Sequence, residues 1–72
     1  MKISYYPETD SMYIDLSKES SVESREISPG VVLDYDATGN LTGIDIDNAR
    51  NKLDLHELIL SKIPVTKQTI AA

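Results

Sequence analysis

The chain has 72 residues and a formal net charge of −5, from 12 acidic and 7 basic side chains, and it contains no cysteine. This length allows a single domain, and the missing cysteines exclude disulfides, thiolate metal sites and cysteine nucleophiles. The acidic balance disfavours nucleic acids and anionic lipid surfaces, because both are bound through lysine and arginine, and it fits a basic protein partner or simple solubility.

The sequence also shows no targeting segment. Its first residues, MKISYYPETD, contain no apolar run of the length that a signal peptide needs. No stretch approaches the roughly 20 apolar residues of a transmembrane helix. We therefore expect a cytoplasmic protein that does not associate with membranes.

Alternating apolar residues predict a β-hairpin at the start of the chain. Strands are expected at about residues 2–6 and 11–17, joined by the turn PETD at residues 7–10. Placing Tyr6 opposite Ser11 brings the apolar side chains of both strands to one face. A buried apolar face is what normally fixes strand register.

The middle of the chain predicts further strands. A weak strand is expected at about residues 22–27, where Val22 and Ile27 differ in parity. A bulge, or an exposed edge strand rich in charge, would explain that pattern. Stronger strands are expected at about residues 30–36 and 41–47, on either side of the turn ATGN.

The turn between these two strands leaves two registers open. A four-residue loop sets Asp36 opposite Leu41 and sends Asp45 to the polar face of the sheet. A three-residue loop sets Asp36 opposite Asn40, with Gly39 as a bulge. It would send Asp45 towards the apolar face, which an unpaired carboxylate resists. We therefore prefer the four-residue loop.

Apolar residues at helical spacing predict a C-terminal helix over about residues 53–62, with a start at Asn48 as a longer alternative. Asp54 and Glu57 fit a capping box, and Pro64 prevents the helix from continuing. Through Leu55, Leu58 and Ile59, the helix is expected to cover an apolar face made by Ile3, Tyr5, Met12, Ile14, Leu33, Tyr35, Ile44 and Ile46.

These elements predict an α+β fold. We expect residues 1–64 to form a single domain, a small antiparallel β-meander of four to five strands with the C-terminal helix packed on one face. Residues 65–72 are expected to be a tail, for which an added strand and disorder both stay open. A core this small supplies only about 3–5 kcal/mol of stability, so a partner or a second copy would help the fold.

Two stretches, KISYYPETDSMYIDLS and ISPGVVLDYDATGNLTGIDIDNA, resemble domain-of-unknown-function family 2283, a group of short prokaryotic proteins. The resemblance covers roughly residues 2–49. The matching positions of the second stretch are Pro29, Gly30, Val31, Asp34, Tyr35, Asp36, Gly39, Gly43, Ile44 and Ile46. It implies a mostly antiparallel sheet with a helix and offers no catalytic residue to transfer. Some members look like the antitoxin of a toxin–antitoxin pair, which implies a small ribonuclease-like toxin as partner.

The stretch DYDATGN raises the question of a calcium site. Asp34, Asp36, Thr38, Gly39 and Asp45 partly follow the EF-hand loop pattern. Both flanks alternate like strands, however, whereas an EF-hand loop lies between helices, and the carboxylates converge in neither register. We expect a hairpin turn with a solvated acidic face, and no resident metal or other cofactor.

Nothing in the chain predicts an enzyme. His56 is the only histidine and is expected to face solvent on the predicted helix. Carboxylate pairs that do acid–base work need a cleft for the substrate, and a single sheet with one helix offers little concavity. We therefore predict no catalytic residue.

Aromatic and apolar side chains among the aspartates predict a protein-interaction face, because tyrosine is enriched at protein interfaces. In the preferred register its members are Tyr6, Tyr13, Val32, Asp34, Asp36, Leu41 and Asp45. The leading hypothesis is a non-enzymatic protein-interaction module, the antitoxin of a toxin–antitoxin pair, with a basic toxin as partner. The alternatives are a structural homodimer with no ligand, and a weak metal or small-ligand binder that uses the Asp-rich face.

Overall fold

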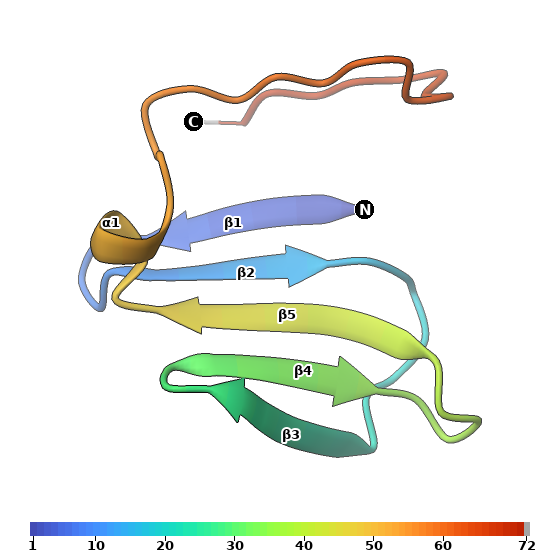
Figure 1. Cartoon of the computed structure of the whole chain (residues 1–72). Helices are drawn as coiled ribbons and strands as arrows, with labels where there is room; N and C mark the ends of the chain where they lie inside the picture. Colours follow the sequence, from blue (N-terminus) through green and yellow to red (C-terminus); the bar gives the residue numbers. More distant parts are fainter. Residues whose placement is uncertain (72) are drawn as a thin grey trace.

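A computed structural model of the chain, which describes residues 1–71, contains one antiparallel sheet of five strands (Figure 1). The strands are β1 (Lys2–Tyr6), β2 (Ser11–Asp15), β3 (Glu23–Ser28), β4 (Val31–Tyr35) and β5 (Leu41–Asp47). A helix of one turn, α1 (Ala49–Lys52), follows β5. The predicted class, a small antiparallel sheet with one C-terminal helix, is confirmed.

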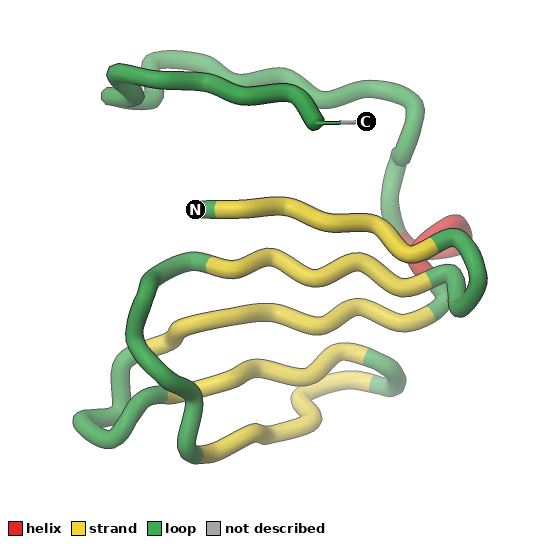
Figure 2. The backbone as a smooth tube through the Cα atoms, turned by 180° about the vertical axis from the view of Figure 1, so that it is seen from behind, coloured by secondary structure: helices red, strands yellow, loops and turns green. Residues whose placement is uncertain are grey.

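The strand order is β1-β2-β5-β4-β3, so the sheet is not the sequential meander that we expected. The connection after β2 crosses to the far edge of the sheet, and β5 returns to the centre (Figure 2). There Ile44 lies opposite both Ile14 of β2 and Leu33 of β4. This order gives β2 and β5 apolar neighbours on both sides and leaves the exposed, charged strand β3 at an edge.

The first hairpin has the predicted register, with Tyr6 opposite Ser11 and Ile3 opposite Ile14. Its turn closes at Asp10, whose backbone is left-handed, with φ of 52°. The weak strand β3 shows both features that its mixed parity predicted. It is exposed along its whole length, and its register with β4 shifts between Glu26 and Ser28.

The hairpin of β4 and β5 uses each of the two alternative registers in a different part. At the turn, Asp36 N–H donates to the Asn40 carbonyl at 2.9 Å, which is the three-residue loop. Farther along, Val32 lies opposite Asp45, as the four-residue loop predicts. A register shift that leaves Thr42 as the extra residue joins the two parts. Such a bulge was not expected here, and it keeps Asp45 on the polar face.

The helix predicted over residues 53–62 is wrong. The chain leaves the helical conformation at Leu53, with φ of −126° and ψ of 151°, and residues 53–71 contain neither helix nor strand. An isolated helix of about ten residues is marginal in water without packing. The segment runs beyond the β1 edge instead of across the sheet (Figure 1), so it lacks that packing. The predicted tail is therefore continuous with an extended segment, and residue 72 lies outside the described residues.

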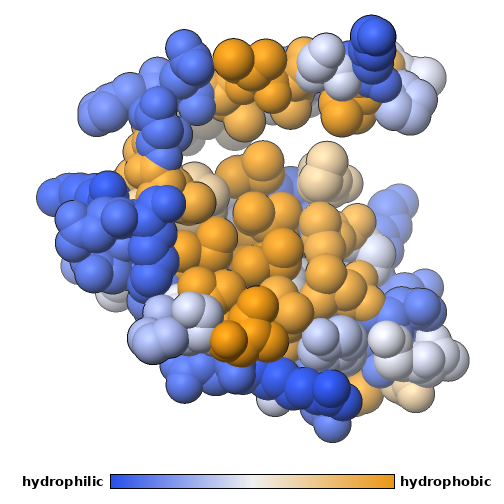
Figure 3. Space-filling model, in the orientation of Figure 1, coloured by the Kyte–Doolittle hydropathy of each residue, from blue (hydrophilic) through white to orange (hydrophobic). Residues whose placement is uncertain are grey.

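The apolar face of the sheet is open. Among residues 1–71, those buried are Thr42, Gly43, Ile46 and Ala49. Apolar side chains form a continuous surface across the middle of the sheet, seen in the orientation of Figure 1 (Figure 3). Leu58 and Ile59, which were expected to cover this face, are 67% and 74% exposed. The expected layer of helix on sheet is thus missing from the described chain.

In the part of the chain that the structure describes, no helix has the length and apolar character needed to span a membrane.

Candidate functional site

The strand register separates an acidic surface from the apolar one. We use the term polar face for the positions Lys2, Ser4, Tyr6, Ser11, Tyr13, Asp15, Ser24, Glu26, Val32, Asp34, Gly43, Asp45 and Asp47, which share one side of the sheet. Among these positions, five carboxylates stand against the single ammonium of Lys2. The polar face is therefore a negatively charged surface with two tyrosines in it.

Most of the predicted interaction residues lie on this polar face, namely Tyr6, Tyr13, Val32, Asp34 and Asp45. Two do not. Leu41 lies opposite Tyr35 and shares the apolar face with it, because the bulge at Thr42 reverses the side to which Leu41 points. Asp36 lies in the turn after β4 and turns its carboxylate inward.

Asp34 is the centre of a hydrogen-bond network on the polar face. The Tyr13 hydroxyl donates to Asp34 Oδ2 at 2.7 Å, and the Ser24 hydroxyl donates to Asp34 Oδ1 at 2.6 Å. The Tyr13 ring crosses β5 at Gly43, where an added Cβ would overlap the hydroxyl. The network therefore links side chains of β2, β4 and β3 across the central strand, and it requires a residue without a side chain at position 43.

The electrostatics of this network keep Tyr13 protonated. The hydrogen bond to Asp34 is the main cause that raises the pKa of Tyr13 to about 12, and burial adds to it. Burial, with the charges of Asp47 and Asp34, also raises the pKa of Asp45. In both cases the charges of neighbouring carboxylates on the polar face add to the shift without being its main cause.

Sequence reasoning missed the link between Tyr13 and Asp34. The preferred register, with Asp36 opposite Leu41, implies that Asp34 lies opposite Gly43, as it does, but the expected meander did not place β2 beside β5. The available signal was Gly43 itself, because an isolated glycine inside a strand often marks the close approach of another group. Only the strand order reveals that this group is Tyr13.

The stretch DYDATGN is a closed turn and not a calcium loop. Asp36 Oδ1 accepts hydrogen bonds from the backbone N–H groups of Thr38 and Asn40 at 3.0 and 2.9 Å. The bond from Asn40 is the main cause that lowers the pKa of Asp36. Gly39 supplies the left-handed residue, with φ of 86°. Within residues 1–71, no three Asp, Glu or His side chains lie close enough together to hold a metal ion.

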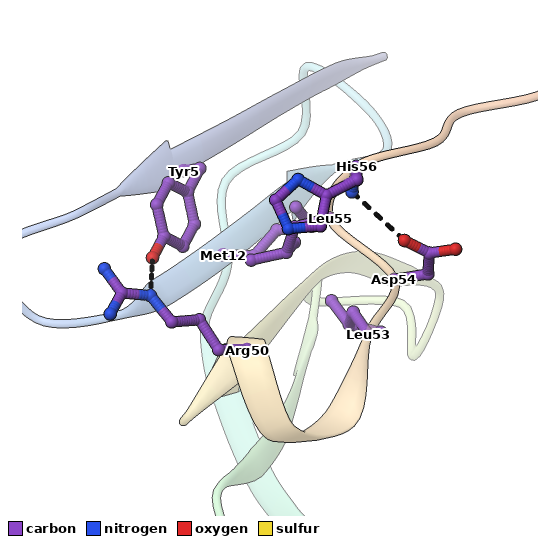
Figure 4. A pocket seen from close by; sticks show the side chains of 7 residues that line it. All are labelled: Tyr5, Met12, Arg50, Leu53, Asp54, Leu55 and His56. Carbon is purple, nitrogen blue, oxygen red and sulfur yellow. Dashed lines mark hydrogen bonds between the residues drawn. The ribbon is translucent and has the colours of Figure 1, made fainter.

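A shallow pocket of about 480 Å³ lies on the apolar side, where the chain leaves α1 (Figure 4). Its lining residues are Tyr5, Met12, Arg50, Leu53, Asp54, Leu55 and His56. Arg50 Nε donates to the Tyr5 hydroxyl at 3.3 Å and lies 3.7 Å from Asp10 Oδ1. The Tyr5 hydroxyl and the Asp10 carboxylate together raise the pKa of Arg50.

The polar groups at this pocket serve the fold. Asp10 Oδ1 accepts hydrogen bonds from both the Tyr5 hydroxyl and the Arg50 backbone N–H, at 2.9 and 3.2 Å. The first hairpin turn thereby holds the start of α1. His56, which was expected to face solvent on a helix, is exposed on the extended segment, and its backbone N–H donates to Asp54. Within residues 1–71, the hydrogen bonds at this pocket join Tyr5, Asp10 and Arg50, and Asp54 with the His56 backbone, and none of them pairs a base with a nucleophile.

The sequence that forms the sheet matches a known protein family. The family model described as "Protein of unknown function (DUF2283)" matches residues 2–50. The chain belongs to the DUF2283 family. The matched region covers β1 to β5 and ends inside α1, so the DUF2283 domain is the sheet itself and the extended C-terminal segment lies outside it. A search of curated proteins found no match. A search of solved structures found none either.

Proposed function

We propose that this DUF2283 chain is a non-enzymatic protein-interaction module that binds a basic protein partner through its polar face. The observation that carries the proposal is the charge of that face, where five carboxylates stand against Lys2. A surface of one sign attracts and orients a partner of the opposite sign. The raised pKa of Asp45 has burial as its main cause, but the charges of Asp47 and Asp34 add to it, and a partner's cation would relieve that repulsion.

The finer role that we propose is that of an antitoxin bound to a small basic toxin. It is supported by the resemblance of some family members to antitoxins and by the net charge of −5. The same charge argues against nucleic acid and membrane surfaces as partners. Tyr13, held protonated by Asp34, is a poor base and a poor nucleophile near neutral pH, which fits a role without catalysis. We propose the cytoplasm as its compartment, in keeping with the absence of cysteine.

Weak cation binding by the Asp-rich face receives little support. The carboxylate oxygens of Asp34 accept hydrogen bonds from Tyr13 and Ser24, and Asp36 Oδ1 is used inside its turn. Part of the acceptor capacity of those oxygens is therefore already taken up by hydrogen bonds within the chain. A protein cation can instead approach Asp45 and Asp47 without disturbing the network.

Co-expression with the product of the adjacent gene tests the proposal. We expect a complex that copurifies with the chain and weakens steeply as salt rises, because exposed charges are screened. The variant Asp45→Lys should weaken the complex at least about tenfold, the loss expected for a close charge pair at an interface.

The matched control is Glu19→Lys, which makes the same charge change in the exposed connection between β2 and β3. It should leave the affinity within about twofold, because a rim or remote charge contributes little. Equal losses in the two variants would reject the polar face as the binding surface. Absence of any complex with the adjacent gene product would reject the antitoxin role.

A further inference from the structure

The apolar face of the sheet and the C-terminal segment of residues 53–64 are two unmatched apolar surfaces on one chain. The apolar face carries Ile3, Tyr5, Met12, Ile14, Val31, Leu33, Tyr35, Leu41, Ile44 and Ile46. Of these, Ile46 alone is buried in the described chain, at 8% exposed, and Ile3 is 44% exposed. A sheet with one apolar face normally buries it against a second layer. The described chain supplies no such layer.

The C-terminal segment has the composition of the missing layer but lies away from the sheet. Leu53 and Leu55 are half-buried at the pocket beside Met12 (Figure 4). Beyond them the chain runs out past β1 (Figure 1). Its remaining large apolar side chains are exposed by 67%, 74%, 47% and 45% at Leu58, Ile59, Leu60 and Ile63.

The exposed area shows how much surface needs covering. The chain exposes 5981 Å², whereas a compact monomer of 8.0 kDa exposes about 4,500 Å². The excess of about 1,500 Å² is larger than the roughly 800 Å² that one partner contributes to a standard interface. Covering it on two copies would remove about 3,000 Å² in total, which lies in the range of obligate homodimers.

Charge decides which faces of two copies can meet. Two polar faces would bring like charges together, which is unfavourable. The charged side chains at positions of the apolar face on β3 are Glu23 and Arg25, and these form an ion pair at 3.1 Å. Arg25 also lies over the Tyr35 ring, 5.2 Å from its centre. The apolar face is therefore close to neutral and can approach another copy without repulsion.

We infer that two copies of this chain form a symmetric dimer in which the C-terminal segment of each lies on the apolar face of the other. The same chain offers both complementary surfaces, so one contact repeated by a two-fold axis covers both and closes the assembly. The hinge is the stretch from Leu53 to His56, where the chain leaves the sheet. Once packed, Leu58 and Ile59 have the support that a helix over these residues lacks in isolation.

Sedimentation of the full chain tests the inference. We expect a mass twice the 8.0 kDa of the monomer at micromolar concentration. The double variant Leu58→Asp/Ile59→Asp should raise the dissociation constant at least about a hundredfold, because it buries charge in place of apolar surface on both copies. These side chains make few contacts within one chain, so the sheet should still fold; circular dichroism checks this.

The matched control is Val22→Asp/Ile27→Asp, which makes the same change at two apolar residues that are 66% and 59% exposed beside and within β3. It should remain a dimer. A monomeric wild type, or a dimer that both double variants weaken equally, would overturn the inference.

Isotope-filtered NMR on a mixture of labelled and unlabelled copies distinguishes a C-terminal segment that packs on the other copy from one that packs on its own sheet. The proposed dimer predicts contacts between the methyl groups of Leu58 or Ile59 in one copy and those of Ile14 or Leu33 in the other. Contacts within one copy only would show that the segment folds back on its own sheet, and the inference would fail. The result is independent of partner binding, since the polar face is on the other side of the sheet and is left unchanged in every variant.

Discussion

Tyr13 is the residue that ties the polar face together, and its pH behaviour can be measured. Its folded-state pKa is raised to about 12 by the hydrogen bond to Asp34, against about 10 in an unfolded chain. The folded state therefore keeps its proton over a range in which the unfolded state loses it. The contribution to stability is complete below pH of about 10 and is lost as the pH rises through about 12.

We accordingly expect the free energy of unfolding to fall by roughly 1–2 kcal/mol between these pH values, after allowance for solvent screening. Ultraviolet titration of the folded chain should show one tyrosine that ionises near pH 12. In the variant Tyr13→Phe, both this late step and the associated loss of stability should disappear. A late step that persists in Tyr13→Phe would assign it to another tyrosine.

Gly43 is required by what crosses it and not by its own backbone. Its added Cβ would overlap the Tyr13 hydroxyl and ring. We expect Gly43→Ala to lower the free energy of unfolding by about 1–3 kcal/mol, the usual cost of overpacking, and to remove the late tyrosine titration. Chemical denaturation measures the first effect.

The background variant Tyr13→Ala provides the control for Gly43→Ala. Without the Tyr13 ring, alanine at position 43 should be neutral or slightly stabilising, because glycine is the weaker residue inside a strand. The double-mutant cycle should therefore show strong coupling between the two positions. Equal costs of Gly43→Ala in both backgrounds would place the strain in the backbone of β5.

At the scale of elements, the local sequence pattern predicted where the strands lie, but it did not predict their order in the sheet. Period-two alternation placed β1 and β2, and the requirement that apolar residues share a face fixed the register of Ile3 opposite Ile14. The order of strands depends on contacts between residues distant in sequence, such as Ile14 with Ile44. Nothing local to β2 distinguishes a neighbour at β3 from one at β5, so the expected meander was wrong.

The hairpin of β4 and β5 also shows how far local sequence preferences can predict structure. Glycine at position 39 favours a three-residue loop, whereas keeping Asp45 off the apolar face favours a four-residue loop. Both preferences are satisfied, because the bulge at Thr42 lets each act on its own part of the hairpin. Both preferences could be read from the sequence, but the bulge that satisfies them together could not. This bulge also explains why Leu41 is not part of the polar face.

The C-terminal segment shows that apolar residues at helical spacing do not form a helix when nothing packs against them. The apolar spacing of Leu55, Leu58 and Ile59 is helical, yet the structure ends its helix at Lys52. The start of that helix depends on Asp10, which comes from the first hairpin turn and accepts the Arg50 N–H. No sequence rule links positions so far apart. The candidate site was predicted where it follows from strand alternation, and missed where it depends on such distant contacts.

At the scale of the whole molecule, each face of the sheet has a different unfavourable feature. The apolar face lacks a second layer, and the polar face holds carboxylates that repel one another. Burial and the charges of Asp47 and Asp34 raise the pKa of Asp45, so its ionised form is destabilised in the folded chain. The pKa is raised on folding, so this carboxylate lowers stability at neutral pH and the loss is relieved as the pH falls.

The folded chain should therefore gain stability when its charges are screened. We expect the free energy of unfolding at pH 7 to rise by roughly 0.5–1 kcal/mol from low to physiological salt, as the screening distance shortens. The variant Asp45→Asn/Asp47→Asn removes charge from the polar face and should flatten this dependence. Thermal unfolding at fixed protein concentration, in a series of sodium chloride concentrations, measures both slopes.

The control Glu8→Gln/Glu19→Gln removes the same amount of charge from exposed positions in the turn after β1 and the connection after β2. It should keep most of the salt dependence, because these carboxylates lie apart from the clustered ones on the polar face. Equal flattening in both double variants would attribute the effect to net charge alone. A partner complex held by the polar face should respond to salt in the opposite direction, since screening weakens attraction between unlike charges as it relieves repulsion between like ones. The sign of the salt effect thus separates the stability of the fold from the strength of the interaction that we propose for it.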